Sequence, residues 1–142
     1  MTNSLLFEIG FYCYLLATFM IMVLGFIYSF RSQLMPYHLK ALNSSWSEID
    51  KNYQLLFKAL LNGAGFYSLS SAMFMLIILL VPFRSGELWA GLSIGVFGLV
   101  GALPLWLIVR RVKNNTEGNP PLGLVVFVNF LLLSGLICSI AS

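Results

Sequence analysis

Charged residues are scarce in this chain. Asp, Glu, Lys and Arg make up 9% of its 142 residues, whereas a soluble domain carries about 25%. Hydrophobic residues make up 59%, and a soluble domain of this length cannot bury so much apolar surface. The composition therefore excludes an ordinary soluble domain. The eight Lys and Arg residues form no basic stripe with interleaved aromatic residues, which argues against a nucleic-acid partner.

Residues that usually perform chemistry are equally scarce. His38 is the only histidine, and Cys13 and Cys138, the only cysteines, lie far apart in the sequence. This set contains no spacing typical of a metal site, a haem site or a disulfide framework. A phosphate-binding loop, a nucleophile elbow and a zinc-protease motif are also lacking. We therefore expect no metal and no cofactor, and the sequence specifies no reaction.

What the sequence has instead is four long apolar runs. Each reaches the roughly 20 residues that cross about 30 Å of hydrocarbon, and in lipid such segments must be helices because the backbone has to satisfy its own hydrogen bonds. The first run lacks the basic flank of a signal peptide, so we expect it to remain as a span. We predict an all-α integral membrane protein, a single domain over residues 1–142 that forms a bundle of four transmembrane helices. The predicted spans are 5–30, 46–80 (including an extension beyond the membrane), 88–111 and 121–141.

The positive charges predict how these helices are oriented. Seven of the eight lie after the first span, at the start of the second, or after the third: Arg31, Lys40, Lys51, Lys58, Arg110, Arg111 and Lys113. Arg84 alone follows the second span. Because loops on the cytoplasmic side are enriched in Lys and Arg, both termini are predicted to lie outside the cytoplasm.

A capping pattern predicts where the second helix begins. Ser45 and Glu48 are spaced as a capping box, in which each side chain accepts a hydrogen bond from the other residue's backbone amide. Apolar residues then recur at helical steps through Trp46, Ile49 and Tyr53. We expect a continuous helix from Trp46, whose first turns project beyond the membrane.

Few polar side chains lie inside the predicted spans. Asn62 and Asn129 fall at similar depths from the cytoplasmic side and are expected to hydrogen-bond between helices, although a substrate or ion site there is the alternative. Glu8, near the outer end of the first span, is expected to pair with Arg84.

Small residues form one face of the third span. Gly91, Gly95, Gly98 and Ala102 are spaced by four, three and four positions, which lets another helix approach closely. The pattern leaves open whether that helix belongs to the same chain or to another copy.

Polar and aromatic residues cluster near the predicted cytoplasmic surface. They are the candidate contacts for a ligand or for lipid: Tyr37, His38, Trp46, Arg110, Arg111 and Lys113. Basic residues here could hold an anionic headgroup, or they could serve only as topology determinants. His38 could transfer protons, or it could cap a turn.

Several short motifs carry a family resemblance. These are Met35-Pro-Tyr-His38 with Trp46, the run from Pro82 to Ala90, and Pro120-Pro121. With them the chain resembles an uncharacterised family of small four-span bacterial inner-membrane proteins. The resemblance implies a bacterial inner (cytoplasmic) membrane location and no particular activity. In size and span number the chain is also similar to the membrane enzymes of eicosanoid and glutathione metabolism, but it lacks their Glu-Arg and Asn-Glu signatures.

Three functions remain open at this level. The first is a non-enzymatic accessory module that binds membrane lipids or a partner, as a homo-oligomer or as a subunit of a membrane complex. The second is a membrane enzyme that acts on a lipophilic substrate at the cytoplasmic face through Tyr37, His38 and Arg110. The third is a small oligomeric transporter or channel, which would need a polar path through the protein.

Overall fold

A computed structural model describes residues 4–142, and all of its regular elements are helices. No strand occurs in this range, in agreement with the predicted all-α class. Four helices are long and apolar enough to cross a membrane: α1 (Ser4–Ser29), α3 (Lys51–Ile78), α4 (Leu88–Asn115) and α5 (Leu122–Ala141). The short elements are α2 (Pro36–Leu42), the 3₁₀ turn η1 (Trp46–Glu48) and the π-helical turn η2 (Leu79–Phe83), which continues α3.

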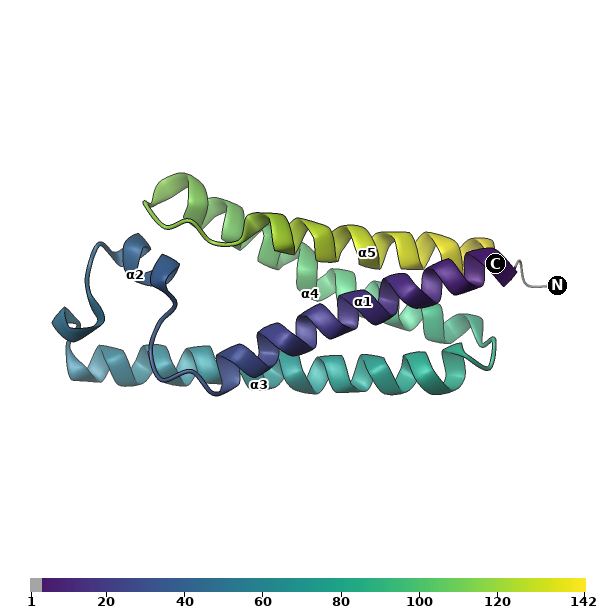
Figure 1. Cartoon of the computed structure of the whole chain (residues 1–142), viewed down its shortest axis with the longest axis horizontal. Coiled ribbons are helices and arrows are strands. Elements are labelled where there is room, and N and C mark those ends of the chain that lie inside the picture. Colours follow the sequence, from purple (N-terminus) through teal and green to yellow (C-terminus); the bar gives the residue numbers. More distant parts are fainter. Residues whose placement is uncertain (1–3) are drawn as a thin grey trace.

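The long helices are packed in an order that differs from their order in the chain. The beginning of α1, the α3–α4 connection and the end of α5 lie at one end of the molecule, which we call the turn end (Figure 1). The short helix α2 and the α4–α5 connection lie at the other, the α2 end. α1 packs along both α3 and α5, and α4 packs along α5, whereas α3 and α4 scarcely touch. On one side of the molecule, therefore, the two neighbouring helices α3 and α4 have little direct packing between them.

Glycines bring α1 and α3 into backbone contact. A Cβ atom placed on Gly25 of α1 would lie 2.7 Å from the backbone nitrogen of Leu69 in α3. A Cβ on Gly65 of α3 would overlap the backbone of Tyr28 and Ser29 in α1. Neither position tolerates a side chain, and such close approach is how small residues strengthen helix association in lipid.

The small-residue face of α4 packs against helices of the same chain. Gly91, Gly95, Gly98 and Ala102 are all buried. Their neighbours are Ser139, Leu136 and Leu132 of α5, together with Tyr14 of α1. The buried hydroxyl of Tyr14 also donates a hydrogen bond to the carbonyl oxygen of Gly91, at 2.7 Å. The predicted close helix contact is therefore present, and the open question of its partner is answered by α5 and α1.

The predicted ion pair closes the turn end. Arg84 Nη1 donates to Glu8 Oε1 at 3.1 Å, and the guanidinium also lies 3.9 Å from the centre of the Phe11 ring. Both charged side chains are 43% exposed, so the pair contributes little stability. It links the beginning of α1 to the connection that follows η2.

The prediction of one continuous helix from Trp46 is wrong. The capping box itself forms, because the backbone nitrogen of Ser45 donates to Glu48 Oε2 at 2.8 Å. It caps only the three-residue turn η1, however, and the chain is extended at Ile49. The α-helix then begins at Lys51.

A second cap explains this later start. The carboxylate of Asp50 accepts a hydrogen bond from the backbone nitrogen of Asn52 at 2.9 Å, which makes Asp50 the N-cap of α3. Gln54 then holds the preceding turn against α3, since its amide donates to the carbonyl oxygens of Trp46 and Ile49, both at 2.8 Å. A capping signature identifies a local turn and does not show how many turns follow it.

Candidate functional site

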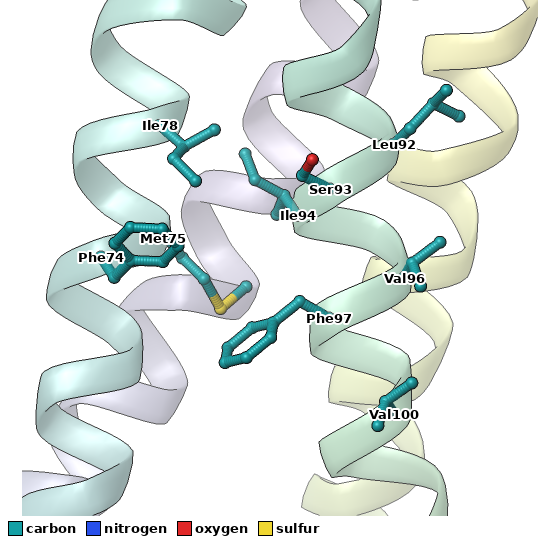
Figure 2. A pocket seen from close by; sticks show the side chains of 9 residues that line it. All are labelled: Phe74, Met75, Ile78, Leu92, Ser93, Ile94, Val96, Phe97 and Val100. Atoms are coloured by element: carbon teal, nitrogen blue, oxygen red, sulfur yellow. The ribbon is translucent and has the colours of Figure 1, made fainter.

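The unpacked side of the molecule contains a lateral cleft between α3 and α4. Its turn-end section has a volume of about 520 Å³. Figure 2 shows Met75 of α3 and Phe97 of α4 pointing into the space between the two helices. The rings of Phe74 and Phe97 also meet edge to face, with centroids 6.5 Å apart. The full lining is Phe74, Met75, Ile78, Leu92, Ser93, Ile94, Val96, Phe97 and Val100.

The cleft continues toward the α2 end as a second section of about 430 Å³. All four long helices line this section, which shares Met75, Phe97 and Val100 with the first. No residue of either lining carries a charge, and few are polar. The hydroxyl of Ser68, one of these few, donates to the carbonyl oxygen of Ala64 in its own helix. The cleft can therefore hold an apolar group, and its lining offers no charged side chain.

The cleft follows from the two tight helix contacts. Gly65 holds α3 against α1, whereas Gly91 and Gly95 hold α4 against α5 and α1. Because α3 packs mainly on α1 and α4 packs mainly on α5, α3 and α4 make little contact with each other. Gly101 leaves further room on the cleft side of α4, because a Cβ atom there would meet nothing within 4 Å.

A polar cluster lies at the α2 end, where α1 finishes and α2 begins. We define it as Tyr28, Arg31, Tyr37 and His38. The hydroxyls of Tyr28 and Tyr37 are hydrogen-bonded to each other. The Tyr37 and His38 rings meet edge to face, with centroids 4.2 Å apart, and Tyr28 lies edge-on to His38 at 6.4 Å.

Burial favours the neutral forms of Tyr37 and His38. It raises the pKa of Tyr37 well above its ordinary value, and the hydrogen bond with Tyr28 raises it further. Burial, together with the nearby charge of Arg31, lowers the pKa of His38 below its ordinary 6.5. The cluster therefore presents two neutral hydrogen-bonding groups beside one permanent positive charge.

Two nitrogens of the cluster lack a hydrogen-bond partner. Arg31 Nε and His38 Nδ1 are buried, and neither meets a partner among residues 4–142. Buried polar groups are nearly always satisfied by protein, water or a ligand. The cluster is therefore incomplete within the protein chain.

The α4–α5 connection holds α2 in place. Gly118 is buried, and a Cβ atom there would lie 2.7 Å from the carbonyl oxygen of Tyr37 and 2.8 Å from Cβ of Ala41. The short helix thus follows α1 in the chain and contacts the connection that leads into α5. At the α2 end, α2 therefore connects the α1–α3 pair with the α4–α5 pair.

The two predicted intramembrane amides bind backbone carbonyls of neighbouring helices. With its amide nitrogen turned toward α1, Asn62 donates to the carbonyl oxygens of Tyr28 at 3.0 Å and Arg31 at 3.1 Å. Asn129 Nδ2 of α5 donates to the carbonyl oxygen of Ala102 in α4 at 3.0 Å. Each amide therefore joins a different pair of helices, as expected for structural hydrogen bonds. Asn62 also fixes the end of α1 that carries the cluster.

The predicted ligand contacts are only partly brought together. Tyr37 and His38 lie in the cluster, whereas the guanidinium of Arg110 lies 5.6 Å from the Trp106 ring of its own helix. Arg111 and Lys113 are exposed near the end of α4, and Trp46 belongs to η1, where Gln54 binds its carbonyl oxygen.

Tyr28 and Arg31 were missed as site residues by reasoning from the sequence. Helical spacing could not group them, because α1 ends at Ser29 and Arg31 lies beyond it. The one signal in the sequence was that both residues shortly precede the Tyr37-His38 pair.

Within the described residues, no three His, Cys, Asp or Glu side chains are grouped as a metal site would require.

The family resemblance drawn from short motifs stays a prediction. Comparison of the chain with models of known families, with curated proteins and with solved structures finds no match.

Proposed function

We propose that this protein is a non-enzymatic membrane module that takes up the acyl chain of a membrane lipid in the α3–α4 cleft. The observation that carries the proposal is an uncharged cleft that opens sideways between two long apolar helices. A group that enters from the side of such helices comes from the hydrocarbon of the bilayer. The lining provides no charged group for catalysis.

The size of the cleft favours an acyl chain over a partner helix. Its sections of about 430 and 520 Å³ fall in the range of about 300–1,000 Å³ typical of small-molecule pockets. A helix with its side chains is about 10–12 Å wide. It could not enter without separating Phe74 from Phe97, whose rings meet across the cleft.

The other two functions gain less support. The enzyme hypothesis relied on Arg110 acting with Tyr37 and His38, but Arg110 lies against Trp106. A transporter would need a polar path, whereas the cleft lining is apolar. Oligomerisation stays a prediction, and any contact between copies would have to use a surface other than the buried Gly91–Ala102 face.

The cleft can be tested by filling it. Gly101→Phe would add a ring to a residue that lines the α2-end section, at a position where a Cβ meets nothing within 4 Å. We expect about tenfold less bound lipid, a loss of about 1.4 kcal/mol of binding energy, measured by native mass spectrometry of protein purified in mild detergent. The matched control is Gly63→Phe, since Gly63 has equally open surroundings and lies outside the cleft. Equal lipid retention by both variants would contradict the proposal.

We further propose that four helices cross the bacterial inner membrane, with the α2 end in the cytoplasm and both termini outside. Seven of the eight positive residues lie near the α2 end: around α2, at the beginning of α3 or at the end of α4. Arg84 lies at the turn end. This asymmetry is the pattern of cytoplasmic and external loops.

Labelling of introduced cysteines tests the orientation. Cys13 and Cys138 are first replaced by Ala, and Ser85 or Asn115 is then changed to Cys. A membrane-impermeant maleimide should label Ser85→Cys in intact spheroplasts and Asn115→Cys only after the membrane is opened. The reverse pattern would show that the α2 end faces outward.

A further inference from the structure

We infer that the Tyr28–Arg31–Tyr37–His38 cluster is the headgroup site for an anionic phospholipid whose acyl chain lies in the cleft. This inference rests on the proposed function and names the class of lipid. It is carried by three observations: the position of the cluster relative to the cleft, the unpaired charge of Arg31, and the shortage of acceptors around it.

The cluster continues the cleft along α1. Ile21 and Leu24 are the α1 side chains that line the α2-end section, together with Met20. Tyr28 follows Leu24 by four positions, so it lies on the same helix face about 6 Å farther along. Arg31 lies two residues after the end of α1, and the amide of Asn62 binds the carbonyl oxygens of both Tyr28 and Arg31. A lipid chain that ended near Leu24 would therefore bring its headgroup to the cluster.

Arg31 carries a charge that the protein does not neutralise. Between residues 4 and 142 its guanidinium makes no hydrogen bond and no ion pair, and its Nε is buried. The residue as a whole is only partly buried, but its enclosed Nε has no acceptor, and a buried donor left unsatisfied costs free energy. Arg is also the side chain whose fixed fork of N–H donors best fits phosphate oxygens, so a phosphate group would supply what the site lacks.

The rest of the cluster favours an anion over a neutral headgroup. No carboxylate belongs to it. His38 is held neutral and has a buried ring nitrogen without a partner, so it can donate one hydrogen bond. The hydroxyls of Tyr28 and Tyr37 share one hydrogen bond, so one of their two protons is left for the pair to donate. A phosphate diester accepts from all of these groups, whereas the choline of a zwitterionic lipid would place a second positive charge near Arg31.

The experiment compares lipids that share acyl chains and differ in headgroup. Purified protein in detergent is titrated with dioleoyl phosphatidylglycerol, dioleoyl phosphatidylcholine or inorganic phosphate, and binding is read from native mass spectra and from the thermal transition. The wild type should bind phosphatidylglycerol about tenfold to a hundredfold more tightly than phosphatidylcholine, as one charged hydrogen-bonded contact would give. Inorganic phosphate should have little effect.

Variants assign the preference to the cluster. Arg31→Gln should reduce the preference to threefold or less, and the double variant Tyr28→Phe/Tyr37→Phe, which removes only the two hydroxyls, should reduce it partly. Lys40→Gln is the control, because Lys40 is an exposed cation on α2 outside the cluster, and it should keep the preference. If Arg31→Gln does not fold, Tyr28→Phe/Tyr37→Phe still decides: an unchanged preference in that double variant would overturn the headgroup site.

The remaining outcomes separate this inference from the proposed function. Equal binding of both lipids by the wild type would overturn the headgroup site and leave the acyl-chain cleft intact. Binding of neither lipid would overturn both. Equal stabilisation by inorganic phosphate would show a site for a free anion, which would also contradict the inference. Two results together support both the cleft and the headgroup site: the wild type prefers phosphatidylglycerol, and Gly101→Phe loses binding of both lipids.

Discussion

Gly65→Ala is expected to destabilise the protein strongly, although it adds only a methyl group. The added Cβ would overlap the backbone of α1 at Tyr28 and Ser29. A side chain can rotate away from such an overlap, but a helix backbone cannot. The two helices would have to separate along their contact. We expect a loss of about 1–3 kcal/mol or more, measured as a lower thermal unfolding transition in detergent.

The matched control for this substitution lies two residues away. Gly63→Ala makes the same change in the same helix, where a Cβ meets nothing within 4 Å. It should change stability by no more than about 0.5 kcal/mol, as for surface substitutions in general. Equal unfolding temperatures for Gly65→Ala and Gly63→Ala would mean that α1 and α3 do not approach each other in this way.

Gly95→Leu is expected to lower thermal stability without changing the size of the protein in detergent. A Cβ at Gly95 would lie 2.7 Å from the Tyr14 hydroxyl and 2.8 Å from Cδ1 of Leu136, and the rest of the leucine would extend further between α4, α1 and α5. Overpacking of this kind costs about 1–3 kcal/mol. Unfolding temperature and size-exclusion elution should be measured on the same sample.

The same substitution at Gly101 provides the comparison. Gly101→Leu also adds a leucine to α4, but in a place where its Cβ meets nothing within 4 Å, so its unfolding temperature should stay close to that of the wild type. A smaller particle for Gly95→Leu would indicate that the face binds another copy. Unchanged size and stability would place the face against lipid.

Features that depend on neighbouring residues could be predicted from the sequence. Long apolar runs without charges form helices wherever water is absent, so all four long helices were predicted, three of them within about one residue at their first position. The helix from Lys51 is the exception, since the local cap at Ser45 and the second cap at Asp50 both look like helix starts. The pairing of Glu8 with Arg84 also followed, because both lie at the same end of their helices.

Which helix faces which was decided only by the tertiary structure. Helices that are apolar on every side carry no stripe that distinguishes a protein-facing side from a lipid-facing one. The small residue Gly95 therefore predicted a close helix contact, but it did not predict that α5 and Tyr14 would form that contact. The cleft arises because α3 and α4, adjacent in the chain, are each held by a different neighbour. The polar cluster likewise exists because the chain after α1 turns so that Tyr37 and His38 of α2 meet Tyr28, a contact that no spacing in the sequence required.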